Sequence, residues 1–204
     1  ETHYISQLRE SAGLPTAMVA QAWLDADDAV QVLEQQAAFE FVRSVRHKPH
    51  ANSSARDGRP GGTTDPRWRA GFSNLARLGL RFDLQTPWWH LAEAARLAAD
   101  YPDTSIILNH AGLPSDRSVE GLAGWQAGMS VLASQPNVSV KISGLGQRDL
   151  PWTVAANRDI VRTTIDLFGI ERCMFASNFP VDSLCASFTT IFDGFREIVS
   201  DFSA

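Results

Sequence analysis

Apolar runs and amphipathic segments alternate along most of the chain. Runs of apolar, often β-branched residues predict strands, whereas apolar residues that recur every three or four positions predict helices. The predicted strands are residues 16–24, 41–48, 80–86, 105–112, 138–144 and 172–179. Helices are predicted over residues 1–13, 26–38, 66–79, 90–101, 119–134, 156–168 and 188–199. The polar stretch 49–64 has no periodicity, so we expect a long loop there that could serve as a mobile lid.

This strict alternation predicts an α/β protein with a parallel sheet and helical crossovers. An open doubly wound sheet and a (β/α)8 TIM barrel both fit. Neither G-x-G-x-x-G nor G-x-x-x-x-G-K-[ST] occurs, which disfavours the nucleotide-binding open sheets. The 204 residues plus two βα units of about 30 residues each reach the roughly 250 residues of a typical barrel. We therefore expect an incomplete TIM barrel.

We expect residues 1–204 to form a single domain that is truncated at its N-terminal side and slightly at its C-terminal side. The first residue is Glu1, and the residues that follow it already have helical spacing, with Tyr4, Ile5 and Leu8 on one face. The chain is therefore expected to begin inside a larger domain.

Composition narrows the class of partner. The formal charge is −5 and the 18 Lys and Arg residues are dispersed, so nucleic acid is not expected and a small-molecule substrate is. No apolar run approaches the roughly 20 residues that span a bilayer, and the N-terminal segment lacks the features of a signal peptide. The two cysteines, Cys173 and Cys185, provide no disulfide framework. These features predict a cytoplasmic protein without a membrane partner.

Candidate chemistry lies at the ends of the predicted strands, because barrel enzymes build their active sites at the carboxyl ends of the strands. His110 ends the apolar run of ILNHAG, although a hydrogen-bonded structural histidine is the alternative. The other polar residues near strand ends are Arg46, His47, Asp83, Gln85, Asn109, Lys141, Ser143, Ser177 and Asn178.

Strand alternation sorts some of these side chains. Lys141 and Ser143 share a face opposite Val140, so Lys141 points to the barrel interior if the valines pack on helices. A structural ion pair is the alternative for Lys141. Arg46 is favoured over His47 to enter the mouth, where a guanidinium can hold a carboxylate. Trp88 follows a strand and could form a wall of a substrate pocket, or pack in the core.

Three motifs in this order, ILNHAG, VSVKISGLG and RCMFASNFPVD, resemble the amidohydrolase-related family of TIM-barrel metal-dependent hydrolases, in its lactonase-like branch. VRSVRHKP and LRFDLQTPW also look like strands of that family, so the resemblance covers nearly the whole chain. On this basis the six predicted strands correspond to the third to eighth strands of the barrel.

The resemblance implies roles for individual residues. His110 matches a histidine that binds a metal or polarises the substrate carbonyl, so one divalent ion, Zn or Mn, is implied, with a metal-free site as the alternative. Asn178 stands where the family has an aspartate that takes a proton from the attacking water. Asparagine cannot act as a carboxylate base, and Asp182 could replace it only if its loop folds back. The family's first-strand H-x-H pair is absent, and could lie before Glu1.

The sequence thus favours hydrolysis of a lactone or similar cyclic ester of a small carboxylated or sugar-derived molecule. The catalytic residues would be His110, Asn178 and Lys141. Substrate binding is assigned to Arg46, His47, Asp83, Gln85, Trp88 and Ser143. The alternatives are a metal-dependent decarboxylase of a small aromatic or enoic acid, and a non-catalytic barrel that binds a small acid. An incomplete barrel also exposes sheet edges, which a second copy of the chain or the missing segment would cover.

Overall fold

A single curved sheet of parallel strands organises residues 1–202, which a computed structural model describes. The strands are β1 (Met18–Gln21), β2 (Val42–Arg46), β3 (Arg81–Leu84), β4 (Ile106–Leu108), β5 (Val138–Ile142) and β6 (Cys173–Phe175). They pair in the order β1-β2-β3-β4-β5-β6. This order follows the chain without the reversal that defines a doubly wound sheet, so the predicted barrel type of α/β fold is confirmed.

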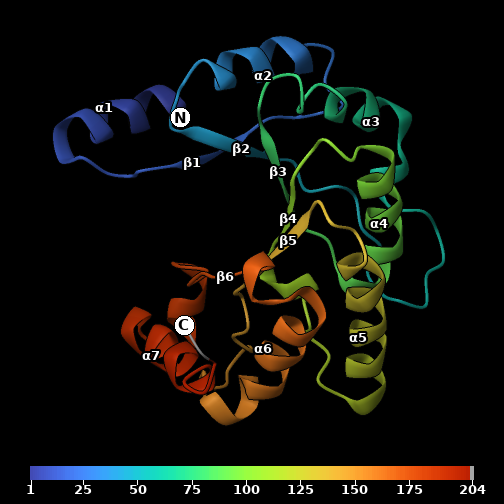
Figure 1. The fold of residues 1–204 in the computed structure, drawn as a ribbon, viewed down its shortest axis with the longest axis vertical. Coiled ribbons are helices and arrows are strands. Elements are labelled where there is room, and N and C mark those ends of the chain that lie inside the picture. The colour runs from blue at the N-terminus through green and yellow to red at the C-terminus, as the bar shows by residue number, and fades with distance from the viewer. Residues whose placement is uncertain (203–204) are drawn as a thin grey trace.

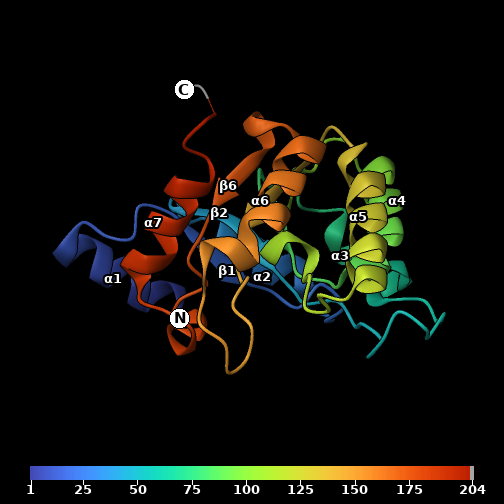
Figure 2. The ribbon, with the colours of Figure 1, turned by 90° about the horizontal axis from the view of Figure 1, so that it is seen from below.

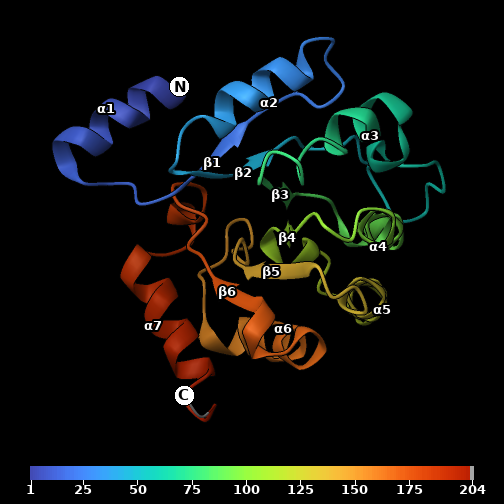
Figure 3. The same cartoon turned by 45° about the horizontal axis from the view of Figure 1, so that its top comes forward.

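Helices cover the outer side of the sheet. They are α1 (Thr2–Ala12), α2 (Ala29–Ala37), α3 (Pro66–Phe72), α4 (Leu91–Asp100), α5 (Val119–Ala133), α6 (Val154–Phe168) and α7 (Phe188–Ile198). The strands follow an arc with β1 and β6 at its two ends, and α2 to α6 lie around it (Figures 1 and 3). Seen from below, α5, α6 and α7 stand in succession beside the sheet (Figure 2). Short 3-10 turns occupy Gly62–Thr64, Trp88–His90, His110–Gly112, Ile170–Arg172 and Val181–Leu184.

Local sequence signals explain where several helices begin. The carboxylate of Asp65 accepts hydrogen bonds from the backbone N–H groups of Arg67 and Trp68, and Pro66 is the first helical residue of α3. The side chains of Ser118, Thr153 and Ser187 cap α5, α6 and α7 in the same way. The predicted start at Asp65 is therefore confirmed, whereas α3 ends at Phe72 rather than at Gly79 and continues as turns.

The core lies between the sheet and the helices, and strand alternation decides what enters it. Phe82 of β3 is fully buried and meets the rings of Trp68 and Phe72, at 5.3 and 5.2 Å between ring centroids. Val140 of β5 is fully buried as well. The residue after each of these, Asp83 or Lys141, consequently points to the opposite face, where the two side chains meet. The predicted alternation of β5 is thus confirmed.

Two segments differ from the sequence prediction. The strand predicted over 105–112 ends at Leu108, because the backbone turns at His110. The loop 49–64 lacks regular structure up to Gly62, yet hydrogen bonds order it, and a buried one from the backbone N–H of Asn52 to Nε2 of His90 ties it to the fold. The Asn52 amide donates to the carbonyl oxygens of Asp57 and Arg59, at 2.8 and 2.7 Å. None of the helices within residues 1–202 is long and apolar enough to cross a membrane.

Candidate active site

A left-handed turn follows β4 and places His110. Four successive residues have positive φ angles: His110 at 57°, Ala111 at 47°, Gly112 at 70° and Leu113 at 58°. This conformation costs a residue with a Cβ roughly 1–2 kcal/mol, so surrounding contacts must hold it. The indole of Trp125 in α5 donates a buried 2.7 Å hydrogen bond to the carbonyl of Ala111. The fold therefore stores strain at His110, a feature that is concentrated at functional sites.

The end of β5 fixes the ring of His110. Its Nδ1 lies 3.0 Å from the hydroxyl oxygen of Ser143. The next residue, Gly144, has a φ of +61° and no side chain, and a Cβ there would collide with the ring. Within residues 1–202, Nε2 of His110 forms no hydrogen bond, so this nitrogen is available to a bound molecule.

Burial, supported by nearby positive charges, lowers the pKa of His110. Burial lowers the pKa of His110 to about 4, and the positive charges of Arg46, Lys141 and Lys48 act in the same direction, while Asp83 opposes them. A neutral imidazole can donate or accept a hydrogen bond at pH 7. The surroundings are therefore suited to an anionic or strongly polarised oxygen next to the ring.

Two polar pairs lie beside His110. Lys141 of β5 reaches across β4 to an ion pair with Asp83 of β3, whose side chain is 1% exposed. A 3.5 Å hydrogen bond links Nη1 of Arg46 to Oε1 of Gln85. A structural ion pair is the alternative to a site role for Lys141 in the sequence-based prediction. The partner in this pair, Asp83, is itself a predicted site residue. The structure thus brings the predicted residues Arg46, Asp83, Gln85, His110, Lys141 and Ser143 to one side of the sheet.

Two predicted substrate-binding residues lie elsewhere. The buried ring of His47 accepts a 3.0 Å hydrogen bond at Nδ1 from the backbone N–H of Leu24, and it packs edge-on against Trp23. His47 follows Arg46 directly, so alternation turns its side chain towards the helices. Trp88 packs against α5, where a Cβ on Gly124 would stand 2.5 Å from its ring. Neither residue joins the cluster around His110.

Asn178 belongs to a neighbouring group with Asp182. Asn178 has a φ of 55°, and its amide donates a 2.8 Å hydrogen bond to Oδ1 of Asp182. The loop after β6 therefore folds back, as it must if Asp182 is to stand near the aspartate position of the family. Burial raises the pKa of Asp182, opposed by the hydrogen bond from Asn178. A Cβ on Gly146 would lie 3.3 Å from this carboxylate, whereas Gly144 contacts His110, so residues 144–146 lie between the two groups.

The donor atoms present do not by themselves fit a divalent ion. Catalytic zinc takes three protein ligands, and no three His, Cys, Asp or Glu side chains of residues 1–202 come together in such a group. Asp83 is occupied by Lys141, and the Asp182 carboxylate is held by Asn178. Among the described residues, His110 is consequently a candidate metal ligand that belongs to no group of three possible ligands.

Sequence reasoning missed Lys48 and Arg117. Lys48 is one of the cations that lower the pKa of His110. Arg117 stands in the loop between β4 and α5, one residue before the N-cap Ser118. Loop residues have no periodicity that would show their direction, and the only available signal was the position of Arg117 on a loop at the carboxyl end of a strand.

The family to which the chain belongs follows from comparison with known proteins. The sequence model of the amidohydrolase family matches residues 4–203. The chain belongs to the amidohydrolase family. The amidohydrolase chain is 37% identical to Uncharacterized protein y4mH of Sinorhizobium fredii, a match that covers all of this chain and 69% of that protein. It is 29% identical to an L-fucono-1,5-lactonase of Burkholderia ambifaria, over 92% of this chain and 63% of the lactonase.

A solved structure shows the same fold. An amidohydrolase of Burkholderia multivorans with bound zinc superposes with a TM-score of 0.81 at 23% identity, over all of this chain and 72% of that one. The six-stranded sheet thus has the winding of an amidohydrolase TIM barrel, and the predicted family and fold class are confirmed. This amidohydrolase chain spans roughly two thirds of the length of the relatives it matches.

Proposed function

We propose that the chain carries much of the active site of a hydrolase that opens a lactone or a similar cyclic ester of a small carboxylated or sugar-derived molecule, with water as the nucleophile. The observation that supports this most strongly is the neutral His110, with Nε2 free, beside the cations Arg46 and Lys141. Similarity to a protein named L-fucono-1,5-lactonase favours an ester bond as the target.

His110 holds the carbonyl oxygen in this proposal. When the hydroxyl of Ser143 donates to Nδ1, the ring proton is on Nε2, which can donate to that oxygen as negative charge develops on it. Arg46 and Lys141 bind carboxylate or hydroxyl groups of the substrate. The positive charges of Arg46 and Lys141, which add to the effect of burial in lowering the pKa of His110, also stabilise the developing oxyanion.

Asp182 is the proton acceptor that the site offers. Asn178 cannot take a proton from water, but it holds the carboxylate of Asp182 at 2.8 Å. Because burial raises the pKa of Asp182, its carboxylate is a stronger base than an exposed aspartate. In this chain Asn178 therefore positions the carboxylate that the family aspartate would itself provide.

A hydrolysis assay tests the proposal. The full-length protein is offered a panel of sugar lactones and carboxylated lactones, with and without added Zn²⁺ or Mn²⁺, and acid release is followed with a pH indicator. We expect ring opening of at least one lactone and a loss of at least 10²-fold in kcat/KM for His110→Ala. The control is His50→Ala, which removes an exposed histidine and leaves the rate unchanged. Absence of turnover across the panel contradicts the proposal.

The same assay separates the alternatives. Release of carbon dioxide from a carboxylated aromatic or enoic substrate would identify a decarboxylase. A non-catalytic barrel would show thermal stabilisation by a small acid without turnover, and Asn178→Asp would not create activity. For the hydrolase, Asn178→Asp places a second carboxylate against Asp182 at hydrogen-bond distance, so the two share a proton and the pH profile changes.

A further inference from the structure

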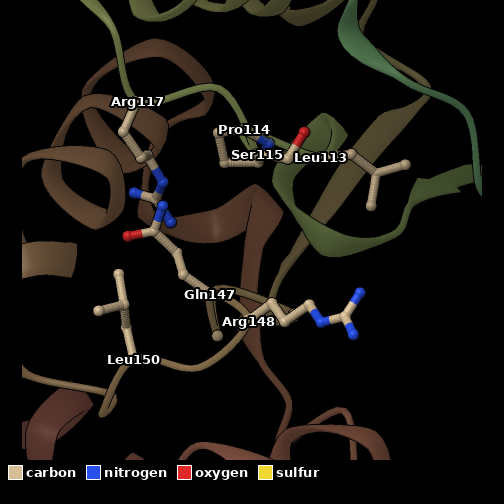
Figure 4. Close-up of a pocket in the computed structure, with 9 residues that line it drawn as sticks. Leu113, Pro114, Ser115, Arg117, Gln147, Arg148 and Leu150 are labelled. Atoms are coloured by element: carbon tan, nitrogen blue, oxygen red, sulfur yellow. The ribbon is translucent and has the colours of Figure 1, made fainter. Parts of the chain in front are cut away.

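A cavity borders the His110 site, between the loop after β4 and the loop after β5. Its volume is about 320 Å³, within the range of small-molecule sites. Its walls include Leu113, Arg117, Gly144, Gln147 and Leu150. Gly144 also packs against the ring of His110, so one residue separates the cavity from the candidate catalytic group. Figure 4 shows Gln147 pointing towards Arg117, with Leu150 and Leu113 on other sides of the space.

The guanidinium of Arg117 is buried at this cavity without a counter-charge. Its Nε and Nη1 atoms are inaccessible and have no hydrogen-bond partner. Across residues 1–202, no carboxylate oxygen lies within the 4.0 Å of the guanidinium that defines an ion pair. A buried charge without a partner costs several kcal/mol, and burial alone lowers the pKa of Arg117.

A structural role accounts for only one of the three guanidinium nitrogens. Nη2 donates to the carbonyl oxygen of Leu145 at 3.2 Å and to Oδ1 of Asn157 at 3.4 Å, which links the loop after β5 to α6. A neutral side chain could make these two contacts at a lower desolvation cost. The positive charge of the guanidinium therefore remains unbalanced by any carboxylate of residues 1–202, although the side chain borders the cavity.

The chemistry of the cavity selects one class of group. The second arginine of the lining, Arg148, is exposed and pairs with Asp149. The one unpaired cation, Arg117, stands beside an amide with leucine side chains around it, which suits a single carboxylate on an apolar or ring-shaped body, whereas a neutral polyol would leave Arg117 unpaired. We propose that this cavity binds a carboxylate of the substrate through Arg117, so the substrate is a lactone that carries a carboxylate. This assignment rests on the proposed lactone hydrolysis, and it places the ester carbonyl at His110 and the carboxylate on the other side of Gly144.

Kinetics of Arg117→Gln in the full-length protein test the assignment. The substrates are a carboxylated lactone that the enzyme opens and the methyl ester of its carboxylate. For the carboxylated lactone we expect KM to rise tenfold or more with kcat nearly unchanged, and for the methyl ester we expect no change. Arg148→Gln is the matched control, because its exposed guanidinium points away from Arg117 and Gln147 (Figure 4). Equal effects on both substrates overturn the assignment.

Three further variants keep the assignment testable if Arg117→Gln misfolds. Leu150 is 54% exposed, so Leu150→Asp adds a carboxylate to the cavity wall without disturbing the core, and Leu150→Asn is its uncharged control. We expect Leu150→Asp to occupy Arg117 and to raise KM for the carboxylated lactone well above the value for Leu150→Asn, which loses only the apolar contact. Arg117→Lys, which keeps the charge without the planar fork, is expected to fall between wild type and Arg117→Gln.

A binding measurement separates failure of this assignment from failure of the proposed function. Cyclohexanecarboxylate and its amide are compared by thermal shift. We expect the carboxylate alone to raise the Tm of wild type and Arg148→Gln, and neither compound to raise that of Arg117→Gln. If these Tm shifts are found but no lactone is hydrolysed, the proposed hydrolase function is refuted and carboxylate binding in the cavity is supported. If lactones are hydrolysed but the acid and the amide shift Tm equally, carboxylate binding in the cavity is refuted and the proposed hydrolase function is supported.

Discussion

A Cβ on Gly144 would stand 2.7 Å from Nδ1 of His110, closer than two such atoms can approach. We therefore expect Gly144→Ala to push the imidazole out of place and to reduce kcat/KM about 10²-fold, since displacements of about 1 Å have effects of this size. Lactone hydrolysis by the full-length variant provides the measurement.

Gly79→Ala is the matched control for Gly144→Ala. Gly79 has a φ of +67°, close to the +61° of Gly144, but a Cβ there would meet no atom within 4 Å. Both substitutions add left-handed strain of about 1 kcal/mol, and Gly144→Ala adds the collision with His110, so it should lower Tm more than Gly79→Ala. Loss of activity in both variants, or in neither, would contradict the account of residue 144.

Ser143→Ala removes the hydroxyl group that holds Nδ1 of His110. The ring then loses its fixed tautomer and orientation, and we expect kcat/KM to fall 10- to 100-fold with little change in KM. Ser139→Ala, four residues earlier on the same face of β5, serves as the control and should retain full activity. A larger loss for Ser139→Ala than for Ser143→Ala would refute this role of the hydroxyl group.

The pKa of His110 makes stability depend on pH. Because this pKa falls from 6.5 to about 4 on folding, the unfolded chain binds more protons than the folded chain between these values. The free energy of unfolding should therefore rise with pH from about 4 to 6.5, by up to about 3 kcal/mol from this group. Urea titrations of wild type and His110→Gln in the presence of a chelator measure the difference. A parallel pH dependence in both proteins would exclude this contribution.

The ion pair between Lys141 and Asp83 predicts an asymmetric mutational response. Lys141→Met leaves a buried carboxylate without its partner, and we expect a loss of about 3–5 kcal/mol in the free energy of unfolding. Adding Asp83→Leu should restore most of the stability but not the activity, because a substrate-binding cation is still absent. Arg77→Met breaks an exposed pair with Glu34 and should change stability little. A double variant no more stable than Lys141→Met would refute the pairing argument.

Alternation and capping made much of the fold predictable. The pattern around Phe82 and Asp83 assigns one side chain to the helices and the other to the site, because successive strand residues point to opposite faces. Asp65 followed by Pro66 identifies the start of α3 for an equally local reason. Such signals need only neighbouring residues.

Features that depend on distant contacts were beyond this reasoning. Nothing in ILNHAG shows that His110 and Ala111 adopt positive φ angles, since Trp125 in the following helix holds that turn. The return of Asp182 to Asn178 and the burial of Arg117 are decided by how loops pack on one another. The candidate site was therefore predictable at its strand ends and unpredictable in its loops.

The order of the sheet also has a consequence for motion. Strands β2, β3, β4 and β5 have a partner on both sides, whereas within residues 1–202 β1 and β6 have one partner each. Amide hydrogen exchange should therefore be slowest at the centre, where Asp83, His110 and Lys141 are anchored, and fastest at the two edges. His110, Asp83 and Lys141 are thus built on the last part of the sheet to open, whereas Asn178 and Asp182 follow the edge strand β6, which opens earlier.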